Sequence, residues 1–178
     1  MKRISRGKFE KMQQLSNDQG VIAALAIDQR GSMKKMMQAA VGEENFSMDQ
    51  VYEFKELVSQ ELTKRVSAIL LDEQYGFKGI QAKDPSCGLI MSYEKTGYDA
   101  NTPGRLPELL PDESLERLLE KGADAAKVLV YYDPDEPQEI LDVKHAFLER
   151  LGTEALAADI PIFVEPIVYD KKITDDHS

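Results

Sequence analysis

Cysteine, histidine and tryptophan are scarce in this sequence: its 178 residues include one cysteine, two histidines and no tryptophan. One thiol forms neither an intrachain disulfide nor a cysteine-rich metal site. Cys87 stands in the stretch DPSCGLIM, far in sequence from His145 and His177. A lone cysteine of this kind is typical of a small buried or turn position. We therefore expect no disulfide framework and no thiol nucleophile.

Positive charge is also in short supply, and long apolar runs are missing. Lysine and arginine number 22 against 32 acidic residues, a net charge of −10. This charge argues against a nucleic-acid partner, whose phosphates need a basic surface, although a small phosphorylated ligand needs only a local group of donors. No apolar run approaches the ~20 residues of a membrane span, and the start, MKRISRGKFEKMQQLSND, lacks the apolar segment of a secretory signal. We expect a cytoplasmic protein without membrane contact.

The sequence does contain five short apolar runs separated by helical patterns. Hydrophobic residues make up 42% of a chain whose length suits one domain. The first run is typical of a strand that is covered on both faces. The runs lie at residues 21–28, 67–76, 88–94, 125–133 and 160–170. Their alternation with helical patterns predicts repeated βα units and a parallel sheet.

Three of the intervening segments carry clear helix signals. Ser47 and Gln50 form a capping-box signature, and proline and glycine mark the ends of two later segments. The predicted helices are residues 47–64, with Val51, Phe54, Leu57, Val58 and Leu62 on one face; residues 111–122, from Pro111 to Gly122; and residues 137–152, from Pro137 to Gly152, with Ile140, Val143, Phe147, Leu148 and Leu151 on one face. The Gly- and Pro-rich stretch at 95–110 is expected to be a long binding loop.

Two architectures fit repeated βα units, an open doubly wound sheet and a (β/α) barrel. The first βα turn, IDQRGS at residues 27–32, has one glycine where a dinucleotide-binding turn needs three. The phosphate-loop sequence Gly-Lys-Ser/Thr is missing as well. These features favour an α/β fold of the (β/α) TIM-barrel type.

Two charged residues interrupt the apolar strands. Lys127 lies within AAKVLVYYD and Glu165 within IPIFVEPIVYD, and a buried charge without a partner costs several kcal/mol. Side chains alternate along a strand. If Lys127 faces the lumen, Leu129 and Tyr131 therefore face it too, and if Glu165 faces it, so do Phe163 and Ile167. The alternative is a structural Lys127–Glu165 ion pair without chemistry, or a strand edge at which either residue reaches water.

Asp28, Gln29 and Arg30 lie at the carboxyl end of the first predicted strand, where ligand sites of α/β proteins collect. An acid and a glycine at a strand end are also ordinary turn and capping chemistry, so these residues alone leave both interpretations open. The pair Asp72 and Glu73 at the end of the second run has the same two interpretations.

Five ordered motifs together resemble the tagatose 1,6-bisphosphate aldolase family: ALAIDQRGSMKKMM, ILLDEQYG, YEKTGYDANTPGRLPEL, GADAAKVLVYYD and IFVEPIVYD. The resemblance implies a cytoplasmic Schiff-base lyase of lactose and galactose breakdown. Such an enzyme splits tagatose 1,6-bisphosphate into dihydroxyacetone phosphate and glyceraldehyde 3-phosphate without a metal or other cofactor. It further implies a (β/α)8 barrel, of which residues 1–178 supply about five βα units as the N-terminal part of a single barrel domain.

The resemblance also assigns residues. Glu165 and Lys127 match the charged pair beside the reacting carbon, where a carboxylate shuttles protons and an ammonium stabilises negative charge. Asp28 and Gln29 match substrate-binding positions.

One family feature is not matched. The Schiff-base lysine of the family lies on the strand after FVEPIVYD, and neither Lys171 nor Lys172 fits that position. We therefore expect this chain alone to be inactive as an aldolase, and either to associate with itself as a homo-oligomer or with a complementing fragment, or to be a truncated piece of the parent protein. The alternative function is a noncatalytic sugar-phosphate-binding or regulatory module.

Overall fold

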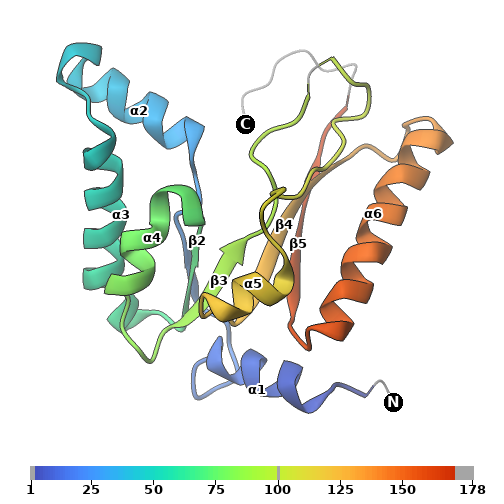
Figure 1. Ribbon diagram of the computed structural model, residues 1–178, viewed down its shortest axis with the longest axis horizontal. Coiled ribbons are helices and arrows are strands. Elements are labelled where there is room, and N and C mark those ends of the chain that lie inside the picture. The colour runs from blue at the N-terminus through green and yellow to red at the C-terminus, as the bar shows by residue number, and fades with distance from the viewer. Residues whose placement is uncertain (1–2, 100, 171–178) are drawn as a thin grey trace.

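The computed structural model describes residues 3–99 and 101–170, and its centre is a parallel sheet (Figure 1). The strands are β1 (Ala24–Ala26), β2 (Ala68–Leu71), β3 (Gly88–Ser92), β4 (Ala125–Tyr132) and β5 (Ile162–Val168). They lie in the order β1-β2-β3-β4-β5, and each pairs in parallel with the next. A doubly wound sheet reverses its strand order at one point, whereas this order never reverses. The predicted barrel-type sheet of five βα units is therefore confirmed.

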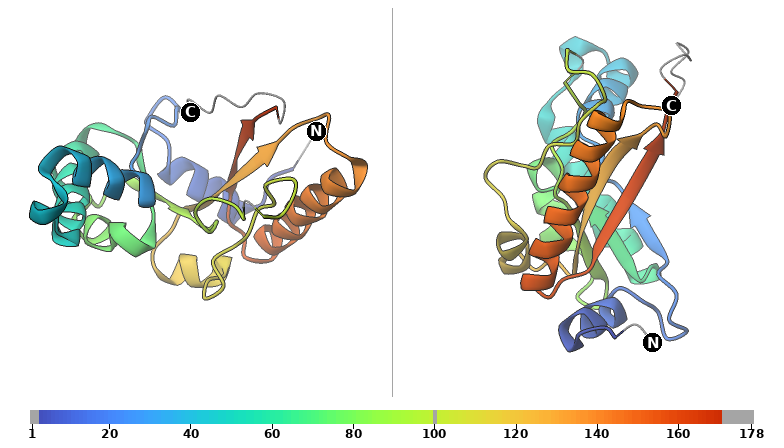
Figure 2. Two further views of the ribbon diagram at one scale, coloured as in Figure 1. Left: turned by 90° about the horizontal axis from the view of Figure 1, so that it is seen from above. Right: turned by 90° about the vertical axis from the view of Figure 1, so that its right-hand side faces the viewer.

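Helices cover the outer side of this curled sheet (Figure 2). They are α1 (Arg6–Gln14), α2 (Gly31–Val41), α3 (Met48–Leu62), α4 (Glu73–Ala82), α5 (Leu115–Glu120) and α6 (Gln138–Ala157), with short 3₁₀ turns η1 (Glu43–Asn45) and η2 (Thr63–Arg65). Helix α1 instead crosses the end at which the strands begin (Figure 1). The strands therefore end at the open side opposite α1.

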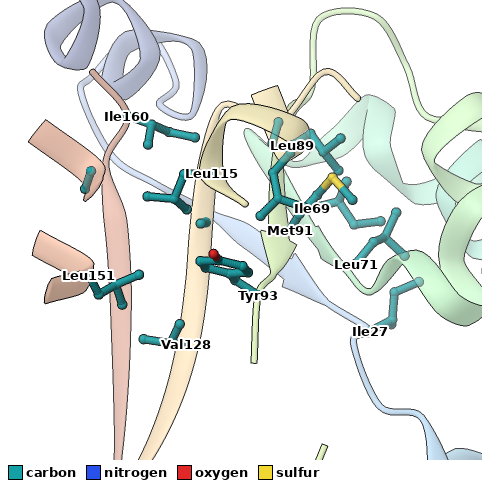
Figure 3. Packing of buried hydrophobic residues seen from close by; sticks show 14 of the residues in the cluster. Ile27, Ile69, Leu71, Leu89, Met91, Tyr93, Leu115, Val128, Leu151 and Ile160 are labelled. Carbon is teal, nitrogen blue, oxygen red and sulfur yellow. The ribbon is translucent and has the colours of Figure 1, made fainter. Parts of the chain in front are cut away.

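Apolar side chains pack on both faces of the sheet. On the outer face, residues of β2, β3 and β4 such as Ile69, Leu89 and Val128 form one cluster with the helices (Figure 3). On the inner face a smaller cluster joins Ala68, Ile90 and Ala125 to Leu15 at the end of α1, with Phe163 of β5 against it, and α1 thereby closes the amino end of the lumen. The lumen is thus apolar at the bottom, which leaves the strand ends for polar residues.

The predicted helix at 47–64 is confirmed, and its start is the predicted capping box. The Ser47 side chain accepts a hydrogen bond from the Asp49 amide, and the Gln50 side chain accepts one from the Ser47 amide at 3.1 Å. Its burial differs from the apolar pattern: Phe54 and Leu57 are exposed, whereas Lys55 is fully buried. The spacing of apolar residues locates the helix, but it does not show which neighbouring elements bury each of those side chains.

Two helix boundaries were predicted wrongly. Pro111 lies in a turn, and α5 begins only after Ser114, whose hydroxyl accepts a hydrogen bond from the Arg117 amide. Pro137 is a cap as expected, but α6 continues through Gly152 to Ala157. Glycine weakens a helix interior by only about 1 kcal/mol, which packing of the last turn offsets. Gly122 does end α5, with a φ of 93°.

Two further segments differ from the strand predictions. The run at 67–76 is a strand only over Ala68–Leu71, because Asp72 caps α4 by accepting a hydrogen bond from the Tyr75 amide at 2.7 Å. Helix α2, unassigned from sequence, places Met33 in the core and leaves Met36 exposed.

Truncating the outer cluster will lower stability. The Leu89 side chain is fully buried, so Leu89→Ala is expected to lower the free energy of unfolding by about 2–5 kcal/mol through lost burial and a cavity. Leu156→Ala is the matched control, because Leu156 is 71% exposed, and it should change the value by less than about 0.5 kcal/mol. Urea denaturation followed by circular dichroism measures both. Equal losses in the two variants would contradict this assignment of the core.

Candidate functional site

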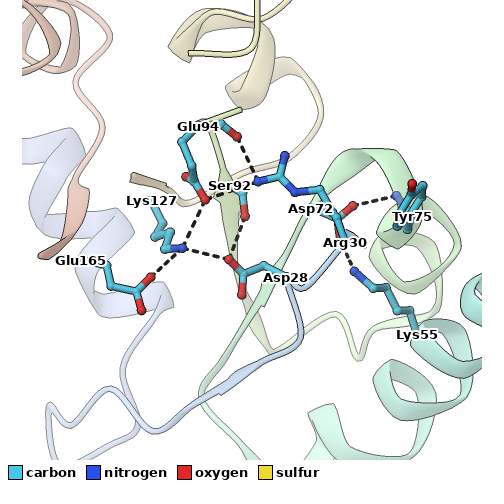
Figure 4. A network of polar contacts seen from close by, with 9 residues as sticks. All are labelled: Asp28, Arg30, Lys55, Asp72, Tyr75, Ser92, Glu94, Lys127 and Glu165. Carbon is cyan, nitrogen blue, oxygen red and sulfur yellow. Dashed lines mark hydrogen bonds and ion pairs between the residues drawn. The ribbon is translucent and has the colours of Figure 1, made fainter. Parts of the chain in front are cut away.

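Strand register brings polar residues from four strands to one place above the apolar floor of the lumen. Ser92 of β3 pairs with Lys127 of β4, and Leu129 pairs with Glu165 of β5. Asp28 comes two residues after the end of β1, and Glu94 comes two residues after the end of β3. Because side chains alternate, these residues face the same side, as Figure 4 shows.

Lys127 is the centre of this group. Its Nζ lies 2.7 Å from Glu165 Oε2, 2.9 Å from Asp28 Oδ2 and 3.2 Å from Glu94 Oε1. The lysine is 5% exposed, and Ser92 donates a further hydrogen bond to Asp28 at 3.2 Å. The Lys127–Glu165 ion pair considered from sequence therefore forms, but as one of three contacts to the same ammonium group.

Arg30 extends the group on the side of α2. Its Nη2 donates to the Glu94 carbonyl oxygen at 3.0 Å and lies 3.4 Å from Glu94 Oε1. Both residues are buried. Arg30 Nε and Glu94 Oε2 have no hydrogen-bond partner among the described residues. The group thus contains two cations and three acids. Two of its polar atoms are available for a further hydrogen bond.

The environment shifts the proton affinities of two of these groups. Burial by itself lowers the pKa of Lys127, but the nearby Glu94, Glu165 and Asp28 outweigh it and raise that pKa well above its usual range. Burial raises the pKa of the Glu94 carboxyl, against the opposing effect of Lys127 and Arg30. Lys127 is therefore a cation at neutral pH, whereas burial makes the Glu94 carboxyl easier to protonate than an ordinary glutamate.

A cavity of about 260 Å³ opens beside this group. Lys127, Leu129 and Tyr131 all line it, which confirms the alternation predicted for β4. Gln29 lines it too, together with residues of the segment after β3, including Leu106 and Pro107. All four residues predicted as site residues from the sequence, Asp28, Gln29, Lys127 and Glu165, border this one cavity.

Residues 22–178 match the model of the DeoC/LacD family of aldolases. The chain belongs to this family. Similar curated proteins include "Tagatose 1,6-diphosphate aldolase" of Listeria innocua, 61% identical over all of this chain and 52% of its own length, and "Tagatose 1,6-diphosphate aldolase 2" of Enterococcus faecalis, 53% identical over 97% of this chain and 51% of its own length. This family member thus spans about half the length of the curated relatives it matches.

Solved structures with a similar fold are barrel-type aldolases. An archaeal fructose 1,6-bisphosphate aldolase superposes with a TM-score of 0.55 at 16% sequence identity, covering 95% of this chain and 60% of its own. A Schiff-base-forming fructose-1,6-bisphosphate aldolase superposes with a TM-score of 0.53 at 18% identity, covering 94% of this chain and 60% of its own. At these identities the likeness shows the fold, and the arrangement of this family member is that of a curled half-barrel.

Sequence reasoning missed Glu94 and did not select Arg30 over its neighbours. Glu94 ends the third apolar run, and the available signal was its position two residues after Ser92, on the lumen side. The neutral interpretation of Asp72 and Glu73 holds: Asp72 caps α4 and pairs with buried Lys55, and Glu73 pairs with Lys121 at 2.6 Å.

Several other expectations concern groups away from the cavity. Cys87 is buried, and burial raises the pKa of its thiol, as expected for a structural residue. Lys171 and Lys172 lie outside the described residues. Within residues 3–99 and 101–170, no helix is long and apolar enough to cross a membrane. In the same residues no three His, Cys, Asp or Glu side chains are grouped to hold a metal ion.

Removing the shared cation will destabilise the fold in a pH-dependent manner. Lys127→Met leaves Asp28, Glu94 and Glu165 without their common partner, so near pH 7 we expect the free energy of unfolding to fall by about 3–5 kcal/mol. The loss should shrink near pH 5, because burial already raises the pKa of Glu94 and its protonation relieves the repulsion. Urea denaturation at both pH values measures this.

The control for that experiment is Lys95→Met. Lys95 also borders the cavity, but its ion pair with Glu108 is exposed, and solvent screens such pairs so that they contribute little to stability. A loss in Lys127→Met that is as small as in Lys95→Met, or that is larger near pH 5 than near pH 7, would contradict this account of the charged group.

Proposed function

We propose that the chain carries part of the active site of a Schiff-base aldolase that cleaves tagatose 1,6-bisphosphate to dihydroxyacetone phosphate and glyceraldehyde 3-phosphate. The observation that carries the proposal is the buried ammonium of Lys127, shared by three acids beside a cavity at the strand ends. Membership of the aldolase family and the names of the similar curated proteins support the same chemistry. Residues 1–178 are in this proposal the N-terminal part of one barrel domain.

The acids of the site differ in what can reach them. The Glu165 side chain is 48% exposed, whereas that of Glu94 is 8% exposed. Glu165 is therefore the carboxylate that a ligand or a water molecule reaches, and we assign it the proton transfers of carbinolamine dehydration and carbon–carbon cleavage. Lys127 stabilises negative charge that develops on substrate oxygens, and Asp28 and Gln29 bind the substrate hydroxyl groups.

The covalent nucleophile is the part of the chemistry that the assigned residues do not supply. Lys127 is held as a cation by its acids, and a protonated amine does not attack a carbonyl group. The family resemblance places the Schiff-base lysine on a later strand, which residues 1–178 do not match. The chain in this proposal binds and positions sugar phosphate but needs the rest of the barrel to react, either from a continuing chain or by association. Its proposed location is the cytoplasm.

The chain alone is expected to bind substrate fragments without forming a covalent bond. With dihydroxyacetone phosphate and borohydride, mass spectrometry should find no reduced lysine adduct, while calorimetric titration should detect binding. Circular dichroism establishes that the sample is folded. An adduct on Lys127 would contradict the assignment of Lys127 as a cation.

Supplying the other half of the barrel is expected to restore cleavage. A chimera joins residues 1–178 to the unmatched part of the Listeria innocua relative, and its cleavage of tagatose 1,6-bisphosphate is followed by coupled assay. Glu165→Gln in the chimera should lower kcat by about 10²–10⁴-fold, whereas Lys34→Met, on the outer helix α2, is the control and should leave it unchanged. A folded chimera that binds dihydroxyacetone phosphate without cleaving the bisphosphate would favour the noncatalytic binding module instead.

A further inference from the structure

Arg105 occupies a cage of tyrosine rings near the ends of β4 and β5. Its guanidinium carbon lies 4.3 Å from the ring centre of Tyr169, 4.8 Å from that of Tyr98 and 5.4 Å from that of Tyr131. All three distances are within the range of cation–π attraction, about 6 Å. The rings also contact one another edge to face, Tyr98 with Tyr131 at 4.9 Å and Tyr131 with Tyr169 at 6.2 Å. One arginine thus joins three segments that are distant in sequence.

The backbone at this position is unusual in a way that fixes the arginine. Gly104 has a φ of 92° and Arg105 a φ of 44°, so two consecutive residues are left-handed. A Cβ atom on Gly104 would lie 2.4 Å from Ile140 Cγ2 of α6, which shows how closely this turn packs on that helix. A non-glycine residue in this region is strained and persists only where its surroundings impose it. The tyrosine cage is the surrounding structure that does so.

The cage adjoins the cavity of the proposed site. Tyr131 borders both, since it lines the cavity and contacts Arg105. Leu106, Pro107 and Glu108 follow Arg105 directly and form part of the cavity wall. Figure 1 shows this segment, between β3 and α5, rising to the end of the sheet where β4 and β5 finish. We call residues 101–110 the cover segment.

Apart from the cage, backbone hydrogen bonds connect the cover segment to the residues around β3 at its end nearest α5. Leu110 donates its amide to the Tyr93 carbonyl at 3.0 Å, and the Lys95 amide donates to the Glu108 carbonyl at 2.8 Å. On the far side of the cage, Tyr169 is itself held, because its hydroxyl donates to Glu136, which also pairs with buried Lys144. The ring that receives Arg105 is therefore a fixed point of the scaffold.

We propose that Arg105 is a positioning residue: its seat among Tyr98, Tyr131 and Tyr169 fastens the cover segment over the cavity and thereby fixes the Leu106–Glu108 wall. The seat itself does not depend on the proposed function. Only its consequence for ligand release rests on the cavity being the sugar-phosphate site. We call the contact of Arg105 with the three rings the latch. In this proposal ligand leaves the cavity when the latch opens, that is, when Arg105 leaves the rings.

Hydrogen exchange measured by mass spectrometry tests the latch without ligand. In Arg105→Leu the amides of residues 101–110 should exchange about tenfold faster than in the unmodified chain, while those of β2 and β3 stay unchanged. Arg150→Leu is the matched control, because it removes the same charge from an exposed position on α6. Equal exchange in the cover segment of all three proteins would overturn the proposal.

A second pair of variants separates the ring from its hydroxyl group. Trypsin cleaves after arginine, so cleavage at Arg105–Leu106 reports how often the arginine leaves its cage. Tyr169→Leu should be cleaved about tenfold faster than the unmodified chain, whereas Tyr169→Phe keeps the ring and should be cleaved at the unmodified rate. Fast cleavage in both variants would overturn the proposal in favour of the hydroxyl contact with Glu136.

Ligand dissociation tests the link to the cavity. If the chain binds dihydroxyacetone phosphate, stopped-flow dissociation should be roughly tenfold faster in Arg105→Leu than in Arg150→Leu. Equal rates would overturn the role of the latch in holding ligand. Absence of binding in the unmodified chain would count against the proposed function, and the exchange and cleavage results would still decide the latch.

Discussion

The arrangement of the strand ends depends on one constraint, the need of a buried ammonium group for acids around it. Lys127 is 5% exposed and contacts carboxylates that follow β1, follow β3 and lie in β5. An unpaired charge at this depth would cost several kcal/mol. Each of its partners comes from a different segment, so the lysine is satisfied only when the sheet has its observed order and register. The same contact therefore gathers the site and selects one strand arrangement.

The position of this group follows from the packing beneath it. Ala68, Ile90 and Ala125 are small or apolar and fill the lumen against Leu15. Residues two positions further along the same strands, such as Ser92 and Lys127, lie one layer higher. Because residues two positions apart point to the same face of a strand, the lining of the lumen changes from apolar to polar along regular strands. The outer faces of the same strands remain apolar throughout, because helices cover them.

The sequence predicts the strands, the barrel-type order and which residues of β4 share a face with Lys127, since these follow from local alternation. It did not predict the extent of α6, because the cost of Gly152 is small beside the packing of Leu151 and Ala155 on either side. Glu94 was missed for another reason. An acid at a strand end has many turn roles, and only the register of β3 on β4 shows that this one reaches Lys127.

Several apolar side chains of α3 and of the edge strand β5 are exposed in the described residues. Val164 and Val168 of β5 are 45% and 75% exposed, and Leu57 of α3 is 58% exposed. β5 is an edge strand in the described sheet, and of its side chains Phe163 packs against the inner cluster whereas Val164, Glu165 and Val168 are exposed. Glu165 shares this edge, and its partial exposure follows from it.

Three acids around one lysine therefore have three different environments. Glu94 is enclosed and has its pKa raised by burial. Asp28 is partly buried and is tied by Ser92 as well as by Lys127, so its orientation is fixed. Glu165 alone combines a direct contact to the lysine with wide access to the surroundings. Glu165 is thus the acid of the three that is open to the surroundings, and Asp28 and Glu94 contact Lys127 from more enclosed positions.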